Sequence, residues 1–241
     1  AMTPSANVMV PEKKNQLNIG ITAGVGDYDI FILTPSVGYS RTIGSGFSVD
    51  GNLTYSMHSG NDISKSGLGD LFLNLNYAPS SAVMLTGGMK IPISDVNKLY
   101  EGKSLPLDYQ PTLGTLDLIM GVAYQPADWH LGLAVQIPIS QNNNLFNPED
   151  WPESSPVHEI PGQFQFNRKG DLVLRISKEI SMSDRVTLIP GLLPIFHLGL
   201  DQTRNDDNVF EDIEGSDGLT LNATLHVNVK LKETSALHFN I

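Results

Sequence analysis

The segment from residue 219 to residue 231 alternates strictly between apolar and polar side chains. Its apolar positions are Leu219, Leu221, Ala223, Leu225, Val227, Val229 and Leu231, and every residue between them is polar. Successive side chains of a β-strand point to opposite faces, so the segment predicts a strand with one apolar face and one hydrated face. The run exceeds the usual strand of about 5 to 6 residues and suits the roughly 9 to 11 tilted residues that cross a bilayer.

The same alternation recurs along the chain. It is clear in 16–25, 47–58 and 129–140, and weaker near 30–41, 67–78, 82–93, 114–125, 166–179 and 185–199. With a final stub from Ser235, the pattern predicts about eleven strands and no helix. A soluble sandwich with one hydrated sheet face produces similar strands, so the connections must decide between the two architectures.

Short and long connections alternate. Tight turns are predicted at 43–46, 78–81, 125–128, 181–184 and 232–234, and longer connections around 58–66, 94–113, 141–163 and 200–217, with 26–29 as a short exception. Alternation places all turns at one end and all loops at the other, as in outer-membrane barrels with periplasmic turns and extracellular loops. The sequence therefore predicts an all-β, antiparallel transmembrane β-barrel over 16–241, in the outer membrane of a Gram-negative bacterium.

The two ends of the chain give further expectations. We expect residues 1–15 to form an N-terminal segment that lies in the periplasm or plugs the lumen. Bacterial single-chain barrels have an even number of strands. We therefore expect residues 235–241 to begin a strand, a closing strand to be missing, and the complete barrel to have about twelve strands; ten is the alternative if 235–241 is not a strand. No signal peptide is visible, so we expect a mature or engineered form.

Aromatic residues flank the predicted turns. They are Tyr39, Phe47, Tyr77, Tyr124 and Trp129. Amphipathic rings gather where a membrane meets water, so these residues predict an aromatic girdle on the turn side. The alternative is that aromatic residues flank the turns of many sheets.

Composition and charge narrow the function. The chain has no cysteine, which excludes disulfides and thiolate metal sites, and we expect no cofactor and no metal site. Loops 141–163 and 200–217 hold -4 and -6 of a net charge of -11. Nucleic acid is therefore not an expected partner, since phosphate contacts need a basic surface. The acidic loops either attract cations such as Ca²⁺ or simply stay hydrated, and they lack the spacing of an EF-hand loop.

The polar positions of the strands are expected to line the lumen. They are Asp50, Asn52, Asp70, Asn74, Asn76, Lys90, Asp117, His130, Asp171, Arg175, Asn222, His226, Asn228 and Lys230. Acids and bases confined together would pair, which lowers the cost of removing them from water. Two interpretations remain open: a filled, self-satisfied core and a conducting path.

Catalysis has little support in the sequence. Neither a GxSxG elbow nor an HExxH pair is present, and we predict no catalytic residue. Pro190 and Pro194 lie in an otherwise apolar predicted strand, where each removes a ladder donor. They mark a candidate lateral opening in the wall.

One hairpin carries a family resemblance. The segment 67–77 reads GLGDLFLNLNY, and the strand 83–92 that follows a short turn ends in Gly88, Lys90 and Pro92. Residues 132–138 repeat a similar strand ending in Pro138. This hairpin resembles that of the outer-membrane family named for the meta-pathway of phenol degradation. The resemblance implies a barrel that transports hydrophobic compounds, and it implies no catalytic residues.

Together these features predict an outer-membrane channel or uptake protein for small, hydrophobic or aromatic molecules, with outer-membrane lipid and a small-molecule solute as partners. The alternative is a non-conducting barrel that serves as a structural or accessory subunit of an envelope complex, with loops 141–163 and 200–217 facing a protein partner. A lipid hydrolase comes third.

Overall fold

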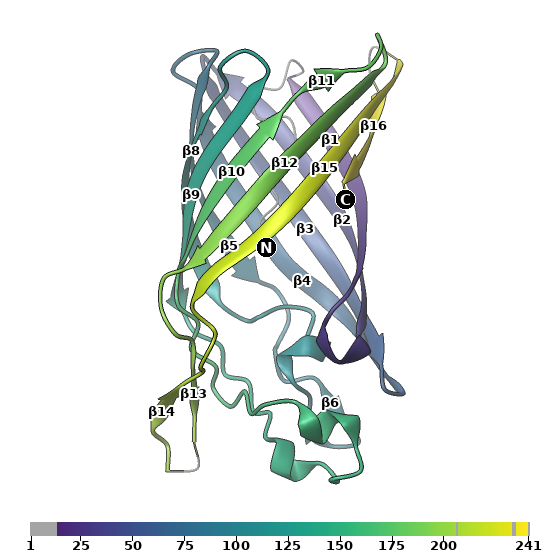
Figure 1. The fold of residues 1–241 in the computed structure, drawn as a ribbon, viewed down its shortest axis with the longest axis vertical. Helices are drawn as coiled ribbons and strands as arrows, with labels where there is room; N and C mark the ends of the chain where they lie inside the picture. The colour runs from purple at the N-terminus through teal and green to yellow at the C-terminus, as the bar shows by residue number, and fades with distance from the viewer. Residues whose placement is uncertain (1–13, 206, 233–234, 241) are drawn as a thin grey trace.

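A computed structural model describes residues 14–205, 207–232 and 235–240. The protein is all-β, as predicted, and one large antiparallel sheet dominates it (Figure 1). The sheet follows chain order: β1 (Asn15–Val25), β2 (Phe31–Gly44), β3 (Phe47–Gly60), β4 (Ile63–Tyr77), β5 (Val83–Pro92), β8 (Leu116–Tyr124), β9 (Trp129–Ser140), β10 (Asp171–Lys178), β12 (Val186–His197), β15 (Gly218–Lys232) and β16 (Ser235–Asn240). The short β11 (Ile180–Ser181) pairs with β12 and continues the line of β10.

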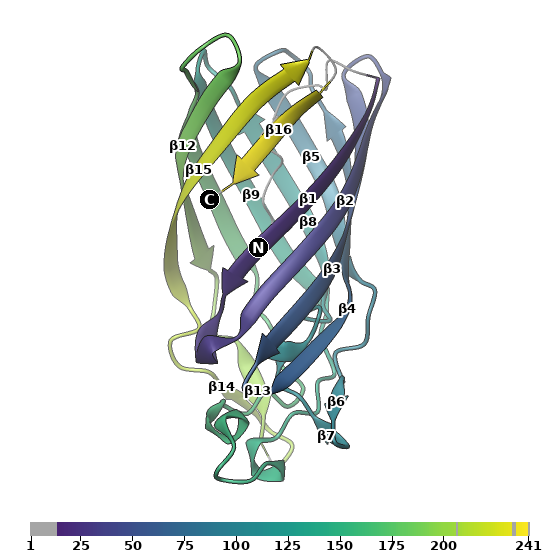
Figure 2. The same ribbon diagram turned by 90° about the vertical axis from the view of Figure 1, so that its right-hand side faces the viewer.

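The sheet curls around an interior. In Figure 1, β12 and β15 lie in front of β3 and β4, and Figure 2 shows β1 and β16 side by side across a seam. No ladder joins β1 to β16 among the described residues. Both strands point toward the bottom of Figure 2, so a single strand between them would be antiparallel to each. The closing strand stays a prediction, and the predicted role of residues 1–15 falls almost wholly outside the described residues.

The two faces of the sheet differ in the way the alternation predicts. Large apolar side chains stay exposed on the outer face, among them Leu17, Ile19, Ile21, Leu73, Leu133, Leu192 and Leu221. The inner face buries polar residues, among them Ser48, Asn76, Lys90, Asp117, Gln136 and His226. This distribution is the reverse of a soluble protein's, which buries apolar residues and hydrates charges.

Within the described part of the chain, none of the helices has the length and apolar character that crossing a membrane requires.

The connections divide between the two ends mostly as predicted. Tight turns join the strands at one end, called here the turn end, and long segments over 93–115, 141–170 and 198–217 lie at the other, the loop end (Figure 1). The long connection expected around 58–66 is wrong, because β3 and β4 extend to a two-residue turn. Asn61 and Asp62 hold left-handed backbone there, with φ of 51° and 62°. Asn and Asp adopt this conformation readily, and a hairpin turn with positive φ at both positions matches strand twist.

The loops contain short elements of their own. These are the hairpin of β6 (Leu99–Tyr100) and β7 (Lys103–Ser104), the hairpin of β13 (Gln202–Arg204) and β14 (Phe210–Asp212), and the 3-10 turns η1 (Asp27–Asp29), η2 (Leu107–Tyr109), η3 (Pro148–Asp150) and η4 (Pro156–Glu159). The buried apolar cluster of the protein lies here, at the loop end. It comprises Ile30, Ile63, Leu105, Tyr109, Phe146, Trp151, Val157 and Ile160, and it is called here the loop cap.

Candidate functional site in the interior of the sheet

The predicted lining residues lie on the strands that enclose the interior, at three levels of exposure. Asn76, Lys90, Asp117, His130, Asp171, Arg175 and His226 are buried; Asp50, Asn52, Asp70, Asn74, Asn222 and Asn228 are half-buried; Lys230, at the end of its strand, is exposed. The structure arranges most of them in three groups: an amide-rich group on β3 and β4, a charged belt near the loop end, and a basic group on β9, β10 and β15.

The first group surrounds Asp50. Asn74 donates to one oxygen of its carboxylate at 2.7 Å, and Asn76 donates to the other at 2.6 Å. Thr86 of β5 then donates to the Asn76 carbonyl at 2.7 Å. The cross-strand register, with Asp50 opposite Asn74, sets this arrangement. Both amides thus bind the carboxylate, and among the described residues no cation forms an ion pair with Asp50.

The charged belt begins with a buried ion pair. The Lys90 ammonium lies 2.9 Å from the Asp117 carboxylate, and it also donates to the Thr115 hydroxyl at 2.9 Å. Gln136 of β9 donates to the same carboxylate. Lys90 and Asp117 face each other in the β5–β8 ladder, so the register brings them together. Removing such a pair from water is costly, and the hydrogen bonds from Lys90 to Thr115 and from Gln136 to Asp117 offset part of that cost, although Oδ1 of Asp117 has no hydrogen-bond partner among the described residues.

The belt continues across the neighbouring strands. Arg168, in the loop before β10, lies 3.7 Å from Asp117 and bonds Asp171. His197 of β12 reaches Asp171 at 2.7 Å through Nδ1 and the Thr220 hydroxyl of β15 at 3.1 Å through Nε2. Side chains from β5, β8, β9, β10, β12 and β15 are thus joined near the loop end.

The loop over 93–115 folds onto the inner face of the sheet. His58 of β3 donates through Nδ1 to the carbonyl oxygen of Asp108 at 2.7 Å. Thr112 donates to the Asp70 carboxylate of β4 at 2.5 Å, and Thr115 contacts Lys90 of β5. Because these partners are inward-facing residues on three consecutive strands, the loop narrows the interior at this end.

A second loop packs on the first and completes the loop cap. Asn144 donates to the carbonyl oxygens of Val96 and Leu105, at 2.7 and 3.3 Å. The Trp151 indole donates to Ser104 at 3.1 Å. Tyr109, buried beneath them, donates to Gly60 at 3.1 Å, and burial raises the pKa of its hydroxyl. The two loops therefore form one folded unit anchored to the ends of β3 and β4.

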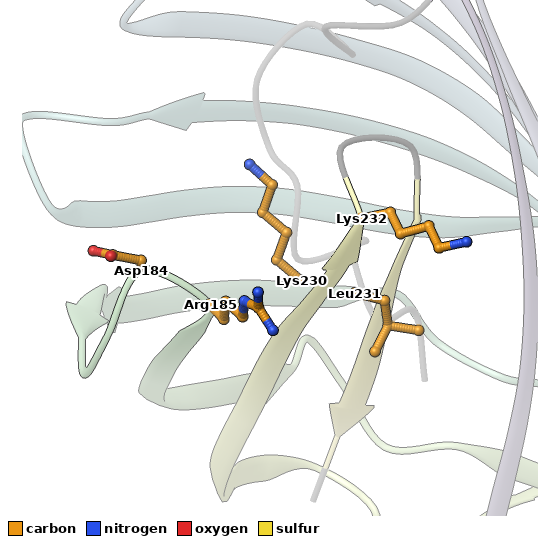
Figure 3. Close-up of a pocket in the computed structure, with 5 residues that line it drawn as sticks. All are labelled: Asp184, Arg185, Lys230, Leu231 and Lys232. Carbon is orange, nitrogen blue, oxygen red and sulfur yellow. The ribbon is translucent and has the colours of Figure 1, made fainter.

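The basic group lies closer to the turn end. Arg175 of β10 and His226 of β15 are both buried, and Arg175 Nη2 lies 3.2 Å from His226 Nε2. His130 of β9 lies 3.5 Å from the Glu179 carboxylate. Toward the turns this wall ends in a groove lined by Asp184, Arg185, Lys230, Leu231 and Lys232 (Figure 3).

The turn-side aromatic residues all lie exposed on the outer face. Phe47 and Tyr77 stack across the β3–β4 ladder with ring centroids 4.5 Å apart, and Lys178 lies over the Trp129 ring at 5.5 Å. Contact with a membrane interface stays a prediction for these residues.

The two prolines interrupt one ladder of β12 and not the other. Pairing with β15 runs unbroken through Pro190 and Pro194. Toward β10 and β11 the ladder skips the positions around each proline and resumes in the same register. A proline has no N–H to donate, so this side of β12 loses hydrogen bonds at both positions.

The described residues hold no group of three or more His, Asp or Glu side chains placed to bind a metal ion.

Compared with known proteins, the chain matches no protein-family model, and no curated protein is similar enough in sequence to count as a relative.

Proposed function

We propose that this protein is a bacterial outer-membrane β-barrel that carries small, hydrophobic or aromatic molecules across the membrane. One observation carries the proposal: exposed apolar side chains cover the outer face of the sheet, while the buried residues of its inner face are largely polar and charged. In water such an outer face would aggregate, whereas in a bilayer it is the favourable arrangement. The proposed barrel closes with one further strand between β16 and β1, which leaves no edge in lipid.

The resemblance of the 67–92 hairpin to the phenol meta-pathway family supports an apolar solute. The ladder between β10 and β12 is interrupted at Pro190 and Pro194, which have no N–H to donate. These interruptions support a route sideways through the wall. The loop over 93–115 and the charged belt fill part of the loop end of the interior, which favours such a route over a straight, wide pore.

The filled loop end also favours a second candidate function, a non-conducting accessory subunit. Here the loop cap and the acidic loops 141–163 and 200–217 would present a stable surface to an envelope protein. A folded cap with its own apolar core supports this alternative.

Uptake measurements separate the candidates. A small aromatic compound should enter intact Gram-negative cells faster when they make the protein, and Pro190→Val with Pro194→Val should slow that entry by restoring ladder donors. Vesicle swelling in arabinose reports an open polar path, and we expect little of it. Fast arabinose entry would instead indicate a simple pore, and no entry of either solute would favour the accessory role.

A further inference from the structure

We infer that the interior binds a small organic carboxylate along the wall formed by β10, β12 and β15, near the turn end. The inference extends the proposed function by naming the charge of the solute. Its role in transport rests on the proposed function. The binding itself is a property of the side chains described below.

Three cations gather at the end of this wall. Arg185 and Lys230 are directly opposite in the strand pairing, since the Lys230 N–H donates to the Arg185 carbonyl oxygen at 2.8 Å. Lys232 lies two residues farther along β15, beyond an irregularity in the β15–β16 pairing. No ion pair to these three residues is found among the described parts of the chain. An exogenous anion is the partner that the inference assigns to them.

The groove is open and has a volume of about 230 Å³. Figure 3 shows Arg185 beside Lys230, whereas Asp184 points away from both. Lys232 extends to the other side of β15, so the cations surround the groove instead of converging on one point. A planar carboxylate suits the pair of Arg185 and Lys230, because a guanidinium offers two parallel N–H donors in a fixed geometry.

The wall behind the groove has the same sign. Lys230, Asn228 and His226 are alternate residues of β15 and share its inner face. His226, the farthest of them from the groove, contacts Arg175. Among the described residues, the inner-face carboxylate in this half of the wall is Glu179, which lies beside His130. An anion that enters the groove therefore approaches the imidazole of His226 and the guanidinium of Arg175, which contact each other.

The opposite wall has the opposite character. Asp50 and its two asparagines lie on β3 and β4, behind β12 and β15 in Figure 1. Two walls of opposite charge produce an electric field across the space between them, and the low dielectric of the protein strengthens it. A small anion is therefore attracted toward β12 and β15, and a cation toward β3 and β4.

Three ligands with one ring test the charge preference. Benzoate, benzamide and benzamidine carry negative, zero and positive charge on similar frameworks. We expect benzoate to bind the purified, detergent-solubilised full chain most tightly in calorimetric titration, and to lose affinity as salt is added. Equal binding of all three, or tighter binding of benzamidine, would overturn the inference. Tighter binding of inorganic phosphate than of benzoate would overturn the assignment to carboxylates.

A charge-matched pair of variants locates the site. Arg185→Gln with Lys230→Gln should weaken benzoate binding by about tenfold, the loss of charge-assisted hydrogen bonds to the carboxylate. Lys14→Gln with Arg41→Gln removes two exposed cations at the same end, on β2 and just before β1, and should leave benzoate binding unchanged. Equal losses in both variants would show a diffuse charge effect and contradict the site. The titration measures binding independently of transport. Benzoate binding without any solute uptake would therefore contradict the proposed function and leave the binding site intact.

Discussion

Nδ1 of His58 lies 2.7 Å from the backbone carbonyl oxygen of Asp108, although the two residues are fifty positions apart in the sequence. Since its Nδ1 donates to the carbonyl oxygen, Nε2 of the neutral ring accepts from the Ser56 hydroxyl, also at 2.7 Å. One inward-facing side chain thus joins the wall of the sheet to the loop that narrows the interior.

Replacing His58 with Leu should release this loop. The change leaves the carbonyl oxygen of Asp108 without the His58 donor, which costs on the order of 1–3 kcal/mol in the free energy of unfolding, while the Ser56 hydroxyl keeps its contact with Thr34. Hydrogen exchange of residues 93–115 should quicken more than that of the strands. Ser59→Ala, at the exposed neighbouring position, is the control and should change neither quantity. Unchanged exchange in His58→Leu would show that the contact does not hold the loop.

The Lys90–Asp117 pair should behave as a coupled unit. Lys90→Met removes the nearer of the two cations beside the buried Asp117 carboxylate and leaves Arg168 at 3.7 Å, so we expect a loss of about 3 kcal/mol in denaturant unfolding of the detergent-solubilised protein. Lys90→Met combined with Asp117→Leu removes both charges and should recover much of that loss. If the loss of stability in the double variant equals or exceeds the sum of the losses in the two single variants, the pair is not coupled as described.

The two faces of the sheet should respond differently to a new charge. Leu192→Arg places a cation on the apolar outer face and should cost roughly 2–4 kcal/mol if the position lies near the bilayer midplane. Asn222→Arg, on the inner face of the adjoining strand, should cost far less. The measurement is reversible unfolding in lipid vesicles, and equal costs would contradict the assignment of the faces.

The proposed orientation can be tested because the chain has no cysteine of its own. Single cysteines at Asn143 and Asp207, exposed at the loop end, should label with an impermeant thiol reagent on intact cells. Cysteines at Ser45 and Ser80, exposed at the turn end, should label only after the cells are broken. The reverse pattern would invert the topology.

Much of the sheet could be predicted from the sequence because alternation is a local signal. In residues 219–231, for example, the polarity of each side chain indicates which face of the sheet it occupies. The turn at Asn61 and Asp62 was missed because polar residues at the tip of a hairpin resemble a loop when their backbone geometry is unknown. The lining residues could be predicted for the same reason as the strands, since they are the polar positions of the alternating pattern.

The contacts among these residues could be predicted only in part. Lys90 and Asp117 belong to adjacent strands, and their pairing depends on a register that the sequence does not specify closely. The contact of His58 with Asp108, and the apolar core of the loop cap around Phe146 and Trp151, depend on how two long loops fold over the sheet. No periodic pattern marks such loops, so their burial was not predicted.

Fluorescence of Trp129 in lipid vesicles tests the central claim most directly. Trp129 is exposed on the outer face beside a turn, whereas the second tryptophan, Trp151, is buried in the loop cap, and Trp151→Phe leaves Trp129 as the only indole. For a membrane-spanning barrel, lipids with brominated acyl chains should quench Trp129 strongly, most of all when the bromine lies close to the headgroup. A chain that remains monodisperse in water without detergent, with Trp129 unquenched, would contradict the account.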